Sequence, residues 1–174
     1  MLEHGGYNVV GKTTFGKGTM QNTFDVPSTV GDELKVTRGK WLSPDENWVH
    51  KAEGGTYGVT PTHIVELNNY FYTSSIYTDD EIAYDKVGYE VENLQKILSA
   101  ITDYTGRVDG YYDIATTEAV SAFQVTYGLE KTGNVDQLTA SKLNEIFRTF
   151  IKDKTNDNQL QEALELCVED VNAD

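Results

Sequence analysis

Residues 7–67 alternate short apolar and polar runs, the pattern of β-strands that bury one face. Turn-forming residues separate these runs at Pro27-Ser28, at residues 43–47 and at the glycine pair Gly54-Gly55. We therefore expect a β-rich first segment. Its strands are predicted at residues 7–11, 19–26, 34–38 and 63–67.

Beyond residue 88, apolar side chains recur about every three to four positions, as one buried helix face requires. The intervening residues 68–86 form an aromatic and polar connector. Four helical faces are expected: Val91, Leu94, Gln95, Ile97, Leu98 and Ile101; Ala119, Val120, Ala122, Phe123 and Val125; Leu138, Leu143, Ile146, Phe147 and Phe150; Leu160, Ala163, Leu164, Cys167, Val168 and Val171.

This change of pattern predicts the fold class and the domains. We expect an α+β protein with a boundary near residue 80. An incomplete β-rich segment at residues 1–80 would precede a small three-helix domain at 81–150 and an acidic C-terminal helix at 151–174.

The helical part contains an internal echo. Gly106-Arg107-Val108-Asp109 recurs as Gly133-Asn134-Val135-Asp136. In each copy a glycine permits a tight turn and a valine can enter the core. Asp113 and Asp136 are the best candidates for helix N-caps, and each cap stabilises its helix by about 1 kcal/mol. The echo predicts two similar turn-then-helix units and indicates no function by itself.

The charge of the chain excludes some partners. The formal net charge is −14. Residues 1–80 carry 6 basic and 10 acidic side chains, and residues 81–174 carry 8 and 18. So acidic a surface repels phosphate backbones and anionic lipid, so we expect no nucleic-acid partner.

Metal and cofactor sites are not expected either. Cys167 is the only cysteine, and His4, His50 and His63 are scattered without the spacing of metal ligands. The first residues, Met1 to Gly6, are short and polar and do not form a signal peptide or a membrane span. The chain is therefore expected to be either cytoplasmic or a fragment whose targeting segment lies upstream.

Lys17 is the candidate catalytic residue. It stands between Gly16 and Gly18 at the entry to a strand, and Gln21 follows four residues later. A general base near neutral pH needs a lysine pKa lowered from about 10.4 to roughly 7, which disfavours the ammonium by roughly 4–5 kcal/mol and demands burial. The alternative is a β-turn that carries a solvated lysine.

A phosphate-binding loop is a second alternative for this region. Gly6 to Thr13 matches the spacing of such a loop formally. The Tyr7 to Val10 segment within it reads as a strand, however, and no helical pattern follows Thr13. Nucleotide binding is therefore not expected.

Val9-Val10-Gly11-Lys12-Thr13-Thr14-Phe15-Gly16-Lys17-Gly18-Thr19-Met20-Gln21 resembles the catalytic-lysine block of the C-terminal processing (tail-specific) peptidases. The resemblance covers residues 7–67, which include the Gly58 to Val65 motif, and it is found again in the closing Asp157 to Leu164 segment. It implies that Lys17 is the general base and that Gln21 positions it. Lys12 stands where the family has a glutamate, and Thr62 where it has an aspartate.

The nucleophilic serine of that family lies upstream of the lysine block, in a small-residue stretch before a helix. No such stretch precedes Gly5 here, and Ser28, Ser43, Ser74 and Ser75 stand in the wrong context. We therefore expect this chain to be inactive alone.

Residues 88–147 resemble a peptidoglycan-binding domain of the three-helix type. The pattern includes Gly106-x-Val108-Asp109-Gly110-Tyr111-Tyr112, Phe123-Gln124, Gly128-Leu129 and Gly133-x-Val135-Asp136. Most of these positions are structural. We expect Tyr111, Tyr112 and Tyr127 to be exposed, and they are candidates for stacking on sugar rings, although core or rim packing accounts for them equally well.

The two resemblances together imply the C-terminal portion of a Ser/Lys carboxyl-terminal processing peptidase with a cell-wall-binding module, located outside the cytoplasm at the wall or membrane. The implied partners are a polypeptide substrate and peptidoglycan, with self-association through unpaired β-edges. Two alternatives stay open. One is a non-catalytic peptidoglycan-binding or wall-anchoring module, and the other is a helical interaction domain without affinity for sugars.

Overall fold

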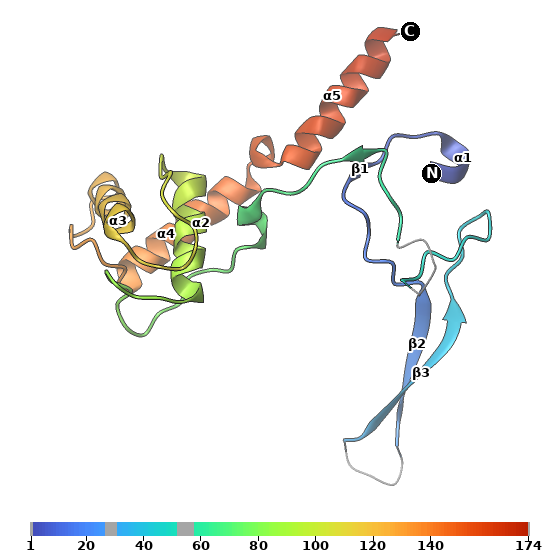
Figure 1. The fold of residues 1–174 in the computed structure, drawn as a ribbon, viewed down its shortest axis with the longest axis horizontal. Helices are drawn as coiled ribbons and strands as arrows, with labels where there is room; N and C mark the ends of the chain where they lie inside the picture. The colour runs from blue at the N-terminus through green and yellow to red at the C-terminus, as the bar shows by residue number, and fades with distance from the viewer. Residues whose placement is uncertain (1, 27–30, 52–57, 174) are drawn as a thin grey trace. The chain divides into compact units, whose positions relative to one another are not determined.

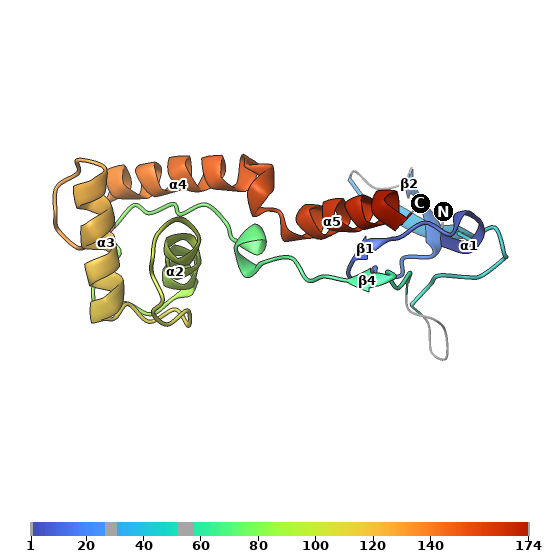
Figure 2. The ribbon, with the colours of Figure 1, turned by 90° about the horizontal axis from the view of Figure 1, so that it is seen from above.

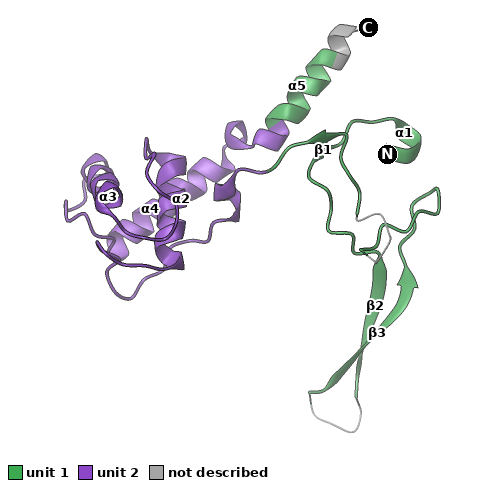
Figure 3. Cartoon of the chain, viewed as in Figure 1, with its two compact units in different colours: residues 1–66, 161–174 green, residues 67–160 purple. Residues whose placement is uncertain are grey.

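The computed structural model describes residues 2–26, 31–51 and 58–173, with the side chains of 170–173 left out (Figure 1). The predicted break at Pro27-Ser28 and the glycine pair Gly54-Gly55 lie outside these residues. The chain divides into two compact units (Figure 3). The first comprises residues 1–66 with 161–174, and the second comprises residues 67–160.

The first unit is built from short strands. A parallel pair joins β1 (Val10–Gly11) to β4 (His63–Ile64), and an antiparallel hairpin joins β2 (Thr19–Asp25) to β3 (Glu33–Lys40). The hairpin register is irregular between Met20 and Gln21. A single helical turn, α1 (Leu2–Gly5), precedes them. Each predicted strand region thus contains a strand, and the α+β class is confirmed.

The first unit lacks a hydrophobic core among its described residues. All fully buried hydrophobic side chains that the structure describes belong to residues 67–160. The hairpin instead exposes four large apolar side chains: Met20, Phe24, Leu34 and Val36. A sheet that exposes its apolar side chains lacks the packing partner that ordinarily stabilises it.

The second unit is a helical domain around one core. Its helices are α2 (Tyr89–Ile101), α3 (Ile114–Thr126) and α4 (Gln137–Lys152). The short 3₁₀ turns η1 (Asn69–Tyr72) and η2 (Lys154–Asn156) flank them. Helix α5 (Asn158–Ala173) follows, and its residues from 161 onward belong to the first unit (Figure 2). The core of the unit is formed by Ile76, Ile82, Val91, Leu94, Ile97, Leu98, Tyr104, Tyr112, Val120, Phe123, Val135, Ala140, Leu143 and Phe147.

The segment before α2 belongs to this core. Ile76 and Ile82 are buried in it, and the Asn144 side chain bonds both the N–H and the carbonyl of Ile76, at 2.9 and 2.8 Å. Residues 67–80, assigned to the β-rich segment from the sequence, therefore pack with the helices.

The two turns of the internal echo are each held by a buried glutamine. Gln95 on α2 accepts from the N–H groups of Asp109 and Gly110, at 3.1 and 3.0 Å. Gln124 on α3 accepts from the N–H of Gly133 at 2.9 Å and donates to the carbonyl of Asn134 at 2.8 Å. The repeat in sequence is therefore also a repeat in structure. In each copy, a glutamine of one helix bonds the backbone of the turn that leads to the next helix.

Both predicted N-caps are confirmed. The Asp113 carboxylate accepts from the N–H of Thr116 at 2.8 Å, and Asp136 accepts from the N–H of Thr139 at 2.7 Å. No helix within the described ranges is long and apolar enough to cross a membrane.

Candidate functional site

Lys17 lies in the loop between β1 and β2, and its side chain is exposed. The N–H of Gly18 donates to the carbonyl of Gly16 at 3.1 Å, so the backbone turns tightly around the lysine. Gly16 has a φ of 78°, a value that side chains other than glycine rarely adopt. The two glycines therefore set the direction in which the Lys17 side chain leaves the backbone.

The segment Trp48 to Lys51 wraps this turn. The indole N–H of Trp48 donates to the carbonyl of Gly18 at 2.8 Å, and the N–H of Lys51 donates to the carbonyl of Gly16 at 2.7 Å. The N–H of Gly18 also lies 3.2 Å from Nδ1 of His50, which accepts its hydrogen. A Cβ on Gly18 would lie 2.7 Å from the Cβ of His50, so only glycine fits there.

The two aromatic residues that contact this turn also stack on each other. The rings of Trp48 and His50 stack with centroids 4.6 Å apart and an interplanar angle of 21°. The ammonium of Lys40 lies 4.1 Å from the centre of the Trp48 ring, a cation–π contact. Trp48 and His50 thus hold the backbone next to Lys17, while the Lys17 side chain is exposed.

Gln21 lies on β2 just after the register irregularity and is also exposed. Its amide donates to the hydroxyl of Thr37 on β3 at 3.2 Å. No hydrogen bond joins Gln21 to Lys17 within the described residues. The catalytic roles of both residues therefore stay predictions.

The four serines considered above as nucleophiles lie in different parts of the chain. The hydroxyl of Ser43 accepts from the N–H of Asn47 at 3.1 Å and shapes a turn. Ser74 and Ser75 belong to the helical unit, and Ser28 lies outside the described residues.

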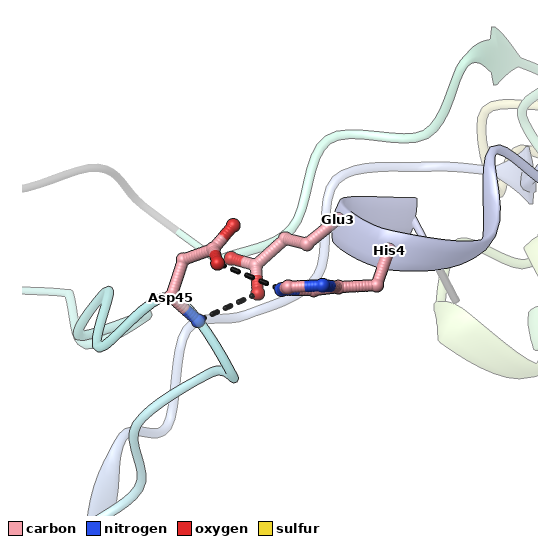
Figure 4. Close-up of side chains that lie close together, drawn as sticks. All are labelled: Glu3, His4 and Asp45. Carbon is pink, nitrogen blue, oxygen red and sulfur yellow. Dashed lines mark hydrogen bonds and ion pairs between the residues drawn. The ribbon is translucent and has the colours of Figure 1, made fainter.

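A polar cluster that the sequence did not predict ties the chain start to the turn after β3. Nε2 of His4 lies 2.7 Å from Oδ1 of Asp45, and Glu3 accepts from the N–H of Asp45 at 3.2 Å (Figure 4). Glu3 also accepts from the side-chain amide of Asn47 at 3.0 Å. Hydrogen bonds from Ser43 and Asn47 hold the pKa of Glu3 below its usual value. All three clustered side chains are exposed and bond to one another or to the turn, so the cluster acts as a tether.

The three tyrosine candidates of the helical unit have different surroundings. Tyr112 is 0% exposed, and its hydroxyl donates to the carbonyl of Gly133 at 2.7 Å. The expectation that it is exposed was wrong, because its ring fills the core between the two echo turns. Burial also raises the pKa of Tyr112.

Tyr111 and Tyr127 remain accessible. Tyr111 is partly buried and donates to Asp85 at 3.0 Å, with the Arg107 guanidinium 5.1 Å from its ring centre. Tyr127 is 37% exposed, and its ring centre lies 4.6 Å from that of Phe123. Tyr104, which the sequence pattern did not indicate, lies on the loop after α2. Its hydroxyl donates to the carbonyl of Arg107 at 2.8 Å.

Comparison with known proteins matches each unit to a family. Residues 1–65 match the model of peptidase family S41, and residues 87–143 match that of a putative peptidoglycan binding domain. Both resemblances seen in the sequence are thereby confirmed.

Similar proteins are longer than this chain. The carboxy-terminal processing protease CtpB of Bacillus subtilis (strain 168) is 38% identical over 164 residues, which cover 94% of this chain and 33% of that protein. CtpA of the same organism is 32% identical over 157 residues, covering 90% and 32%. The chain thus spans about a third of the length of these relatives. The SleB N-terminal domain structure is 30% identical, with a TM-score of 0.40, and covers 41% of this chain and 97% of that one.

Proposed function

We propose that this chain is the C-terminal part of a carboxy-terminal processing serine peptidase, carrying its general base and a peptidoglycan-binding module. The observation that carries the proposal is the succession of two family matches, S41 at residues 1–65 and peptidoglycan binding at 87–143, in one chain that aligns over 94% of its length with CtpB.

The proposed reaction is hydrolysis of a peptide bond in a polypeptide substrate. A serine from a part of the enzyme outside these 174 residues attacks the carbonyl, and neutral Lys17 takes its proton. The acyl-enzyme forms as the amine leaves with that proton, and water then releases the acid. Gln21 orients the lysine. Backbone N–H groups stabilise the oxyanion.

This assignment requires that the complete enzyme bury the amine of Lys17. The chain itself presents Lys17 on a fixed turn with its side chain exposed. The hairpin beside it exposes Met20, Phe24, Leu34 and Val36, a surface suited to pack against further protein. The further part of the peptidase that this proposal requires, packed there, would exclude water from the lysine.

The helical unit supplies attachment to the cell wall. It is an independently cored domain that matches the peptidoglycan-binding model, and its accessible tyrosines suit contact with a glycan. We place the full-length protein outside the cytoplasm, at the wall or membrane. Self-association through the edges of the two-stranded sheets is part of this proposal, because within the described ranges β1–β4 and β2–β3 pair with no third strand.

A second candidate function is a non-catalytic wall anchor. It is favoured by the distribution of the core, since every fully buried hydrophobic side chain among the described residues lies in the helical unit. A helical interaction domain without sugar affinity is the third.

Two measurements separate these functions. The 174-residue chain is sedimented with insoluble peptidoglycan, and the longer gene product that includes the upstream region is assayed on an unstructured peptide. Sedimentation with turnover supports the peptidase, and sedimentation without turnover supports the anchor. Failure to sediment refutes both wall-binding functions and leaves the interaction domain.

A further inference from the structure

A groove of about 640 Å³ lies between helix α3 and the loop that follows α2. Three alanines on one face of α3, Ala115, Ala119 and Ala122, leave the space, and Tyr104 and Tyr127 line it with aromatic surface. The volume lies within the range of small-ligand sites, about 300–1,000 Å³. The groove is thus large enough to receive one amino-acid side chain and its neighbours.

The charge of this groove is of one sign. Its only charged lining residues are Asp103 and Glu118, and both are exposed. Neither carboxylate is hydrogen-bonded or ion-paired to another residue that the structure describes. Helix α2 ends beside them at Ile101 with no basic residue in its last turn, so the negative end of its dipole adds to the same field.

Two cations on neighbouring elements, Arg107 and Lys142, are engaged with other carboxylates. Arg107 pairs with Asp109, and Lys142, whose ammonium lies 5.6 Å from the Tyr127 ring centre, pairs with Glu145 at 2.9 Å. Lys131 lines a separate hollow along α3 that it shares with Glu118. The groove itself therefore attracts a cation and repels carboxylates and phosphates.

We propose that this groove binds the free side-chain amine of the diamino acid in peptidoglycan stem peptides. The inference rests on the proposed wall-binding function and adds the group that is recognised and the residues that recognise it. Stem peptides carry such an amine wherever two strands are not cross-linked. Asp103 and Glu118 would accept hydrogen bonds from the ammonium, and the aromatic and alanine surface would pack on its methylene chain.

This occupant fits the groove better than the other components of a wall. Acetylated sugars are neutral and do not use the two free carboxylates, and wall polymers rich in phosphate are repelled by them. Binding would distinguish peptides with a free amine from those whose amine is consumed in a cross-link. The module would then favour stem peptides whose side-chain amine has not been acylated.

The test titrates the 174-residue chain with an N-terminally acetylated stem peptide that contains lysine and with its Nε-acetylated twin, at low ionic strength. The double variant D103N/E118Q removes both groove carboxylates. The control E130Q/E165Q removes two exposed carboxylates outside the groove and has the same net charge. Retention on insoluble peptidoglycan is measured in parallel for all three proteins.

We expect the lysine peptide to bind the wild type and the control equally, and the double variant about tenfold more weakly, as the loss of two exposed ion pairs predicts. The acetylated twin should bind all three proteins weakly. If the wild type is retained on peptidoglycan and the double variant or the acetylated peptide binds as well as its reference, the groove assignment is overturned while wall binding stands. If the wild type is not retained at all, the proposed wall-binding function fails first.

Discussion

The indole N–H of Trp48 donates to the carbonyl of Gly18 at 2.8 Å, across a sequence separation of 30 residues. On the same glycine, His50 accepts from the N–H at 3.2 Å. The residue after Lys17 is therefore fixed at both its donor and its acceptor by one aromatic pair. A loop lysine that serves as a general base needs such support, because its amine must point reproducibly at a nucleophile.

Gly18→Ala should destabilise the first unit by about 1–3 kcal/mol, because the new Cβ would lie 2.7 Å from the Cβ and 2.8 Å from the N of His50. Hydrogen exchange in the segment around Trp48 and Lys51 measures the effect. Gly39→Ala is the matched control, since its Cβ would meet closely only the flexible end of Met20. Equal exchange in the two variants would contradict the close packing at Gly18.

Trp48→Phe should loosen the turn without removing the ring that stacks on His50. The substitution deletes the donor to Gly18 and leaves an aromatic ring in place. A hydrogen bond of this kind contributes about 1 kcal/mol, so amide exchange at Gly18 should accelerate about fivefold. The measurement is exchange followed by NMR. Trp41→Phe is the control, because Trp41 donates to the Gly18 carbonyl through its backbone N–H, which the substitution keeps.

Gln124→Leu should cost the helical unit about 2–4 kcal/mol. The side chain is 1% exposed and serves the backbone of the second echo turn, and its loss leaves the N–H groups of Thr132 and Gly133 and the carbonyl of Asn134 without that partner. Chemical denaturation followed by far-ultraviolet circular dichroism gives the change in free energy of unfolding. Gln137→Leu, at an exposed position, should change it by less than about 0.5 kcal/mol. A similar loss in both variants would rule out a special role for Gln124.

Asp136→Ala should lower stability by about 1 kcal/mol near neutral pH, and by less in acid. Hydrogen bonds from Thr139 hold the pKa of Asp136 below its usual value. A carboxylate with a depressed folded-state pKa contributes stability above its unfolded pKa of about 3.9 and loses it as pH falls through the folded value. The gap between wild type and variant, measured by urea denaturation, should therefore narrow below about pH 4. A gap that stays constant would show that the charged cap is unimportant.

Regular features of this protein could be predicted from its sequence. The helices and the caps Asp113 and Asp136 follow from local periodicity and turn chemistry, and the structure contains them. Contacts between distant residues could not be predicted. The Glu3, His4 and Asp45 cluster joins positions 41 or 42 apart, and the support of Gly18 by Trp48 and His50 leaves no periodic signal.

The burial of single side chains also could not be predicted from the hydrophobic pattern of the sequence. Tyr112 follows a glycine turn beside another tyrosine, a context that suits a surface as well as a core. In the structure its ring is in the core and its hydroxyl donates to the Gly133 carbonyl. Ile76 and Ile82 stand alone in a polar connector. Their burial depends on distant residues, since Ile76 bonds to Asn144 on α4 and Ile82 forms a backbone bridge with Val135.

Lys17→Arg provides the sharpest test of the proposed base. Arginine keeps the positive charge and most of the length, but it does not deprotonate in proteins, so it cannot accept the proton of a serine. In the longer peptidase that the proposed function requires, this variant should lose about 10²–10⁴-fold in kcat, and Lys17→Ala should lose as much. Lys12→Arg, at an exposed lysine 3.6 Å from Glu66, should retain activity. Substantial turnover by Lys17→Arg would show that another group takes the proton, and the 174-residue chain alone should show none.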